Sequence, residues 1–267
     1  MGKRKAAVCN CARHAAPTLD INMFRHTAPG LSSTLLSHWQ MLLSKVPSQC
    51  AVCHAWPAQR ICSACIARFA QPHNRCMACA IQVPAGVTQC GACLRAPPPL
   101  DLCLAAVDYA YPWAQCIVQF KFQGDPGWAQ VLATLVHQTP GAAAALNAAD
   151  WVLPVPLATK RLRERGFNQA LQLAQQLAPH KVQPHLLLRL HATPAQHTLS
   201  RSQRLRNLDG AFAVEPLRSQ ELAGCRVVLV DDVMTTGATL HAAAVALRRV
   251  GVLNLTALVV ARTPSGN

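Results

Sequence analysis

The chain contains few acidic and few aromatic residues. Only 11 of its 267 residues are Asp or Glu, against 25 Lys or Arg, so the formal net charge at pH 7 is +14. This excess of positive charge favours a polyanionic partner, namely nucleic acid, a phosphorylated ligand or an acidic surface. Aromatic residues make up 5% of the chain, which argues against a surface built mainly from rings that stack on bases. A hydrophobic fraction of 51% is ample for a core and excludes a wholly disordered chain.

Long apolar segments are also absent. The start, MGKRKAAVCNCARH, is interrupted by polar and charged residues and does not resemble a secretory signal. The apolar run from Leu253 to Ala261 is far too short to cross a bilayer as a helix. We therefore expect a soluble, cytoplasmic protein without membrane insertion. In a reducing compartment, an odd count of 13 cysteines favours metal binding over a disulfide framework.

Charge and cysteines divide the chain into unequal parts. Residues 1–100 hold ten Lys or Arg, a single acidic residue, Asp20, and every CxxC pair. The proline-rich segment Arg95–Leu100 marks the boundary, because proline stiffens the backbone. The predicted segments are a weakly ordered extension over 1–46 with a short helix over 31–46, a double zinc-ribbon module over 47–96, and an α/β domain over 101–267.

Beyond this boundary, strand and helix patterns alternate. Buried strands are predicted at 104–111, 151–156, 226–232 and 255–261. Helices are predicted at 113–122, 128–137, 166–177 and 239–250. Such alternation is typical of a parallel sheet with helices on both faces.

Four CxxC pairs form the most specific motif of the N-terminal part. They are Cys50/Cys53, Cys62/Cys65, Cys76/Cys79 and Cys90/Cys93. One CxxC turn points two thiolates at a common centre and Zn²⁺ takes four such ligands, so eight cysteines predict two closed, structural zinc sites. Disulfides, loose thiols and an iron–sulfur cluster are less favoured. We favour an arrangement in which two consecutive CxxC pairs bind the same ion, although the spacing leaves a cross-braced arrangement open.

The remaining cysteines lie in other contexts. The pair Cys9/Cys11 has a spacing that allows metal binding, but exposed residues of a loose tail are the favoured interpretation. Cys103, Cys116 and Cys225 have apolar neighbours and are predicted to be small core residues.

One apolar strand ends in two acids. In the segment Val227–Leu240, Asp231 and Asp232 follow the apolar run, at the strand end where open α/β sheets bind ligands. The loop Thr235–Thr239 then leads into a helix, whose N–H groups and dipole favour a phosphate. Gly237 lets the backbone approach the ligand closely. Since carboxylates accept hydrogen bonds from the two hydroxyls of a ribose, a ribose 5-phosphate satisfies both halves of the segment.

These residues resemble a known family. Two acids followed by a Thr-Thr-Gly loop are similar to the phosphoribosyltransferase signature that binds phosphoribosyl pyrophosphate (PRPP). Further motifs resemble the ComF family of phosphoribosyltransferase-like proteins, as does the CxxC-rich N-terminus. These motifs are Phe120-Lys-Phe-Gln-Gly-Asp125, Val155-Pro156, the segment from Leu157 to Ala170, Gln196, and the segment from Leu199 to Phe212. The resemblance covers residues 50–263 and implies a type I phosphoribosyltransferase-like parallel sheet flanked by helices, with a small N-terminal zinc-ribbon module.

The resemblance assigns roles to the acids and the loop. It implies that Asp231 and Asp232 bind the ribose hydroxyls. It implies that the 5-phosphate is bound by Thr235, Thr236, Gly237, Ala238 and Thr239. Residues 193–212 would form a mobile hood that excludes water from the reaction centre, and a plain surface loop is the alternative.

Basic residues supply candidates for the pyrophosphate. Guanidinium and ammonium groups bind phosphate oxygens, and the leaving group also needs Mg²⁺. Lys121, Arg161 and Arg165 are the candidates, with a solvated basic face as the alternative. Asn168 and Gln169 either cap a helix or, by resemblance, contact the acceptor or the pyrophosphate.

Three functions are compatible with these residues. The favoured one is an enzyme that binds PRPP or a ribose 5-phosphate nucleotide with Mg²⁺ and transfers a phosphoribosyl group to an unknown acceptor. The alternative is a competence protein that binds single-stranded DNA and uses the PRPP site for regulation. A structural adaptor ranks last, because it leaves the ribose-phosphate loop unused. Family resemblance points to DNA uptake in natural transformation, with proteins of the uptake machinery as further partners.

Overall fold

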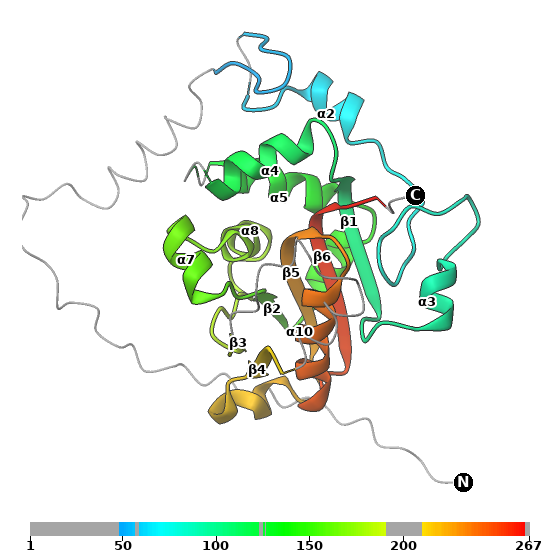
Figure 1. Ribbon diagram of the computed structural model, residues 1–267, viewed down its shortest axis with the longest axis vertical. Helices are drawn as coiled ribbons and strands as arrows, with labels where there is room; N and C mark the ends of the chain where they lie inside the picture. Colours follow the sequence, from blue (N-terminus) through cyan, green and yellow to red (C-terminus); the bar gives the residue numbers. More distant parts are fainter. Residues whose placement is uncertain (1–47, 57–58, 123–124, 126, 191–209, 265–267) are drawn as a thin grey trace, which may run out of the picture.

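The computed structural model describes residues 48–56, 59–122, 125, 127–190 and 210–264. The predicted helix over 31–46, the Cys9/Cys11 pair and most of the predicted hood lie outside these residues. Within the described part, the predicted α/β architecture is confirmed (Figure 1). None of the helices described there combines the length and apolar character needed to span a bilayer.

A four-stranded parallel sheet forms the centre of the molecule. Its strand order is β1-β6-β5-β2, which places the two longest strands in the middle. The strands are β1 (Leu102–Asp108), β6 (Asn254–Arg262), β5 (Arg226–Met234) and β2 (Trp151–Pro154). In the register, Leu229 of β5 lies opposite both Ala257 of β6 and Leu153 of β2. The central strands are buried on both faces, which explains why they appear in the sequence as continuous apolar runs.

Helices cover both faces of this sheet (Figure 1). One face packs against α4 (Trp113–Phe122), α5 (Trp128–Gln138), α6 (Ala142–Ala148) and α8 (Gln169–Leu177). The other face packs against α10 (Ala238–Arg249), the antiparallel pair β3 (Leu187–Arg189) and β4 (Phe212–Val214), and the 3₁₀ helix Pro216–Leu222. A short helix, α7 (Thr159–Arg165), follows β2.

The predicted helices and strands of the sheet are all present, with ends shifted by a few residues. Four other elements lack the patterns that predict them. Helix α6 is a short alanine-rich segment, α7 has no buried residue, and β3 and β4 have only three residues each. Short elements of this kind are stabilised by tertiary packing, so periodicity alone does not indicate them.

The cysteine-rich segment packs against both faces of the sheet. Cys50 and Cys65, next to α2 (Ser63–Phe69), belong to the core that contains α4 and α5. Cys76 and Cys93, the latter on α3 (Gly91–Arg95), belong to the core that contains α10. The segment therefore shares its apolar surface with the sheet, and the boundary near residue 96 stays a prediction.

Candidate functional site

The two acids lie near the carboxyl end of β5. The strand continues two residues beyond them, to Met234, so both are held by sheet backbone. Asp232 is only 7% exposed, and its Oδ1 lies 2.8 Å from Nζ of Lys121 at the end of α4. The Oδ1 of Asp231 accepts a hydrogen bond of 2.8 Å from the backbone N–H of Asp232. Lys121, a predicted site residue, is thus brought directly to the acids.

The environment of Asp231 opposes its ionisation. Burial, together with the neighbouring charge of Asp232, raises the pKa of this carboxyl to about 7, against the lowering effects of its hydrogen bond from the Asp232 N–H and of Lys121 and Arg189. Two adjacent carboxylates with one ammonium partner leave negative charge in excess. Such a pair suits a ligand that brings hydroxyl donors and a cation, as a ribose with Mg²⁺ does.

The loop after β5 has the geometry of a phosphate cradle. Gly237 has φ +82° and precedes α10, which begins at Ala238. The positive φ favours glycine, and a Cβ at this position would lie 2.5 Å from Cε of Met234 and 2.9 Å from Nε2 of His241, so both side chains would have to shift. The Oγ1 of Thr236 accepts a hydrogen bond of 3.4 Å from the N–H of Ala238. The N-terminal end of α10 follows directly on this loop, and its N–H groups and dipole favour an anion.

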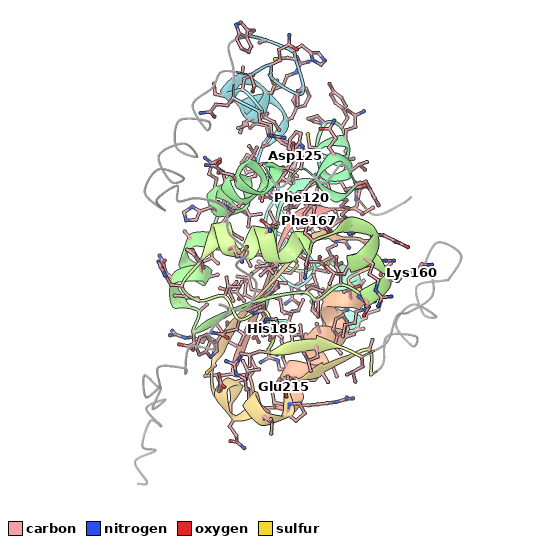
Figure 2. All side chains as sticks on the ribbon, turned by 90° about the vertical axis from the view of Figure 1, so that its left-hand side faces the viewer. Phe120, Asp125, Lys160, Phe167, His185 and Glu215 are labelled. Atoms are coloured by element: carbon pink, nitrogen blue, oxygen red, sulfur yellow. The ribbon has the colours of Figure 1, made fainter. Side chains whose placement is uncertain are left out.

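Helix α7 presents the predicted basic residues. Arg165 is half-buried, donates a hydrogen bond of 2.9 Å to Oε1 of Gln169, and lies over the ring of Phe122 at 5.1 Å. Burial lowers the pKa of Arg165, while Asp232 raises it and Arg161 lowers it, so this guanidinium lies within electrostatic range of the acids. Arg161 is exposed. Lys160, on the same helix, lies at the periphery (Figure 2).

Asn168 and Gln169 stabilise the start of α8. The side chain of Asn168 accepts a hydrogen bond of 3.0 Å from the N–H of Ala170 and donates one of 3.1 Å to the carbonyl of Val155. The capping interpretation is therefore confirmed for Asn168. Gln169 is 1% exposed and holds Arg165 in place. Contacts of either residue with a ligand stay a prediction.

Arg189 is a site residue that the sequence did not indicate. It ends β3, and its guanidinium lies over the ring of Phe212 at 5.2 Å. Burial lowers its pKa, Arg161 lowers it further and Asp231 raises it, so this third arginine lies within electrostatic range of Asp231. Its signal in the sequence is weak, because β3 is short and the residues after Leu190 offer no motif that marks a strand end.

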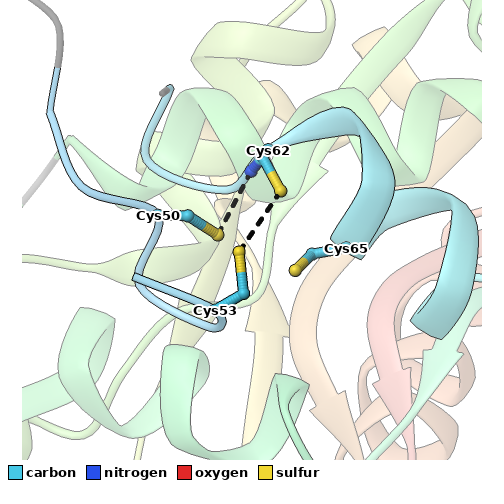
Figure 3. A group of neighbouring side chains, drawn as sticks. All are labelled: Cys50, Cys53, Cys62 and Cys65. Atoms are coloured by element: carbon cyan, nitrogen blue, oxygen red, sulfur yellow. Dashed lines mark hydrogen bonds between the residues drawn. The ribbon is translucent and has the colours of Figure 1, made fainter. Parts of the chain in front are cut away.

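The eight CxxC cysteines form two groups. The first tetrad is Cys50, Cys53, Cys62 and Cys65 (Figure 3), and the second tetrad is Cys76, Cys79, Cys90 and Cys93. Within each tetrad the sulfur atoms all lie within 4.8 Å of one another. The predicted pairing of consecutive CxxC turns is therefore confirmed, and the cross-braced arrangement is excluded.

The tetrads fit a tetrahedral metal. Four thiolates at about 2.3 Å from a zinc ion lie about 3.8 Å from each other. The Sγ atoms of Cys53 and Cys62 are 3.7 Å apart, as are those of Cys79 and Cys90. Backbone N–H groups also point at the sulfurs, as from Cys62 to Cys50 at 3.4 Å, which favours thiolates.

Comparisons with known proteins agree with this fold. A family model described as the phosphoribosyl transferase domain matches residues 163–267. The DNA utilization protein YhgH of Salmonella typhimurium (strain LT2) is 34% identical over 228 residues, which cover 82% of this chain and 98% of that protein. Competence protein F of Haemophilus influenzae is 33% identical over 198 residues, or 72% of this chain and 86% of that protein.

A third relative is similar over a shorter region. Competence protein ComFC of Bacillus subtilis is 37% identical over 93 residues, which cover 35% of this chain and 36% of that protein. Sequence identity to these relatives thus accompanies the structural features of the chain, namely the parallel sheet, the acid pair with its Thr-Gly loop and the cysteine tetrads. The chain belongs to the ComF family of phosphoribosyltransferase-like proteins.

Proposed function

We propose that this protein binds PRPP with Mg²⁺ and transfers its phosphoribosyl group to an acceptor, in a process of DNA uptake or utilisation. The observation that carries the proposal is the acid pair Asp231/Asp232 placed directly before the Thr-Gly loop, with Lys121 in contact with Asp232. The names of the relatives, which refer to competence and DNA utilization, support the biological context.

In this proposal each part of the site acts on one part of PRPP. The acids accept hydrogen bonds from the ribose hydroxyls, and the loop Thr235–Thr239 binds the 5-phosphate. Lys121, Arg161, Arg165 and Arg189 neutralise the pyrophosphate. Mg²⁺ supplies further charge neutralisation on the phosphate oxygens. Transfer breaks the bond between C1 of the ribose and the pyrophosphate oxygen, which keeps the electron pair, and forms a bond from C1 to the acceptor's nucleophile.

Titration calorimetry with PRPP tests the proposal. The protein should bind PRPP in the presence of Mg²⁺, and the double variant Asp231→Asn/Asp232→Asn should lose this binding while remaining folded. Asp150→Asn is a matched control, because Asp150 lies at the opposite end of the sheet and pairs with Arg226 at 3.4 Å. Absence of PRPP binding by the folded protein would overturn the proposal. Release of pyrophosphate with candidate acceptors then distinguishes turnover from binding.

We propose further that each cysteine tetrad holds one structural Zn²⁺. The sulfur spacings support this assignment, and four protein ligands leave no position for substrate. Elemental analysis should find two zinc ions per chain. Chelation should lower the melting temperature, because metal binding to such sites is coupled to folding.

The alternative function, binding of single-stranded DNA with a regulatory PRPP site, is favoured by charge. The chain carries a formal charge of +14, and α7 exposes Lys160, Arg161 and Arg163. This function predicts affinity for an oligonucleotide that falls steeply with salt. Lys160→Gln/Arg163→Gln should then weaken DNA binding and reduce the salt slope, whereas Asp231→Asn/Asp232→Asn should leave both unchanged.

A further inference from the structure

Arg262, the last residue of β6, connects the second tetrad with the phosphate loop. It is 7% exposed. Its Nε donates a hydrogen bond of 2.8 Å to the carbonyl of Cys79. Its Nη1 donates to the carbonyls of Met234, at 3.2 Å, and of Thr235. One planar group therefore binds the backbone of a tetrad cysteine and the backbone of the loop at the same time.

The loop side of this connection leads directly to Gly237. The Met234 carbonyl also accepts a hydrogen bond of 3.0 Å from the N–H of Thr263, so the start of the loop is bound to β6 twice. The Met234 side chain fills the space beside Gly237 where a Cβ would clash, and its Sδ lies 3.5 Å from Sγ of Cys103. A shift of Arg262 would thus move the residues that shape the cradle.

The tetrad side is anchored to the same strands. The N–H of Cys103 in β1 donates a hydrogen bond of 2.7 Å to the carbonyl of Met77, which lies inside the Cys76–Cys79 turn. Arg75 donates to the carbonyl of Ala80 at 3.1 Å and pairs with Asp108 of β1 at 2.9 Å. The position of this turn therefore depends on the ends of β1 and β6, where Arg262 lies.

The buried positive charge of Arg262 indicates why the second tetrad and the phosphate loop would be coupled. Within the described residues its hydrogen bonds all reach backbone carbonyls, those of Cys79, Met234, Thr235 and Thr263, and no ion pair with a carboxylate is formed. A buried cation without an anionic partner is costly. Zn²⁺ with four thiolates carries a net charge of −2, and a bound 5-phosphate is also anionic, so both would stabilise this guanidinium from either side.

We propose that Arg262 is a positioning residue that couples the second tetrad to the phosphate loop, so that Zn²⁺ in the tetrad and PRPP in the loop strengthen each other's binding. The proposal rests on PRPP binding as the proposed function. Within the described residues, no hydrogen bond of the first tetrad reaches the loop. The coupling is therefore specific for the second tetrad, and by linkage it is reciprocal.

Zinc release to a chromogenic chelator tests this reciprocity. The Cys53→Ser variant, altered at an exposed ligand of the first tetrad, reports release from the second tetrad, and the additional zinc that the wild-type protein releases reports the first. Saturating PRPP with Mg²⁺ should slow release from the second tetrad about 10-fold, within the usual range of coupling between sites. Release from the first tetrad should change less than 2-fold. Equal protection of both tetrads would overturn the proposal, because it indicates general stabilisation by ligand.

Arg262→Lys tests the residue itself. Lysine keeps the charge but does not present the planar fork that reaches carbonyls on two sides. Arg248→Lys is a matched control, since Arg248 also binds backbone carbonyls, those of Val252 and Leu253, at the other end of β6. Arg262→Lys should retain two zinc ions and lose the 10-fold protection, whereas Arg248→Lys should keep it. Protection that survives in a folded Arg262→Lys variant would overturn the proposal.

Hydrogen exchange separates failure of this proposal from failure of the proposed function. In the wild-type protein, removing zinc from the second tetrad should speed amide exchange in residues 235–239 at least 10-fold and leave the start of β5 unchanged. This measurement needs no PRPP. It therefore also tests the coupling between the second tetrad and the loop if the Arg262→Lys variant does not fold. Unchanged loop exchange overturns the coupling even if PRPP binds, and absent PRPP binding overturns the proposed function even if exchange responds.

Discussion

The two tetrads have the same four ligands and nearly the same spacing, but they contact different parts of the molecule. The first packs against helices: Trp113 of α4 donates a hydrogen bond of 2.7 Å to the carbonyl of Phe69, and Arg60 lies over the ring of Trp128 at 5.0 Å. The second packs against the ends of β1 and β6, beside the phosphate loop. Two identical cysteine motifs therefore stabilise different parts of the molecule, because a metal site restrains only the elements that pack against it.

The largest difference is expected when each tetrad loses a corresponding ligand. Cys65→Ala and Cys93→Ala remove equivalent buried cysteines, 6% and 5% exposed. Each variant should bind one zinc ion instead of two and unfold at a lower temperature. Calorimetry at low temperature should show PRPP affinity reduced more than 100-fold in Cys93→Ala, which loses the fold of the turn that holds Arg262 as well as the 10-fold coupling to zinc, and less than 3-fold in Cys65→Ala. Equal losses would mean that the two tetrads stabilise the whole fold in the same way.

A smaller effect is expected from Gly237→Ala. The positive φ and the contacts with Met234 and His241 should cost about 2 kcal/mol of stability and distort the cradle. PRPP affinity should fall 10-fold to 100-fold, and zinc should leave the second tetrad faster while the first is unaffected. Gly224→Ala is the control, since Gly224 has φ +74° with no atom within 4 Å of an added Cβ. A PRPP affinity equal to wild type in Gly237→Ala would contradict the role of the loop.

The sequence predicted the acids, the Thr-Gly loop and the cysteine tetrads better than the side-chain contacts that connect them. The strand, the acids and the Thr-Gly loop are local in the chain, so their arrangement follows from β5 and α10 alone. The CxxC spacing favoured consecutive pairs but left the cross-braced arrangement open, and the structure decides between them. In each case the geometry depends on a few consecutive residues, for which sequence patterns are informative.

Long-range contacts were not predictable in this way. Arg262 appears in the sequence as one basic residue after an apolar strand, and its hydrogen bond to Cys79 joins residues 183 positions apart. Arg189 comes within electrostatic range of Asp231 only because β3 pairs with a strand more than twenty residues later. Periodicity and spacing carry no information about such contacts, since tertiary packing determines them.

A change of pH should affect the ribose half of the site and leave the connection to the second tetrad unchanged. Because the pKa of Asp231 is raised to about 7, the folded protein holds a proton that the unfolded chain releases near pH 4. This contribution to stability is present at low pH and is lost as pH rises through 7. Asp231→Asn should therefore raise the melting temperature of the ligand-free protein by several degrees at pH 8 and by about a third as much at pH 5.

Ligand binding should show the opposite dependence. PRPP affinity of the wild-type protein should fall as pH decreases through 7, because protonated Asp231 loses its charge. The midpoint should be the same in Arg262→Lys, since α4 and not the second tetrad supplies Lys121 to the acids. A midpoint displaced by a whole pH unit in that variant would show that the acids and the tetrad are coupled.

The smallest effects are expected from the contacts that hold each tetrad segment in place. Trp113→Phe removes the hydrogen bond to Phe69, and Arg75→Gln removes the ion pair with Asp108. Each should cost about 1 kcal/mol, seen as a melting temperature lower by a few degrees. PRPP affinity should fall a few-fold in Arg75→Gln, because the Cys76–Cys79 turn then holds Arg262 less firmly, and should be unchanged in Trp113→Phe. The two variants should lose similar amounts of stability. A difference in PRPP affinity between them would therefore show that the tetrads differ because only the second lies beside the phosphate loop.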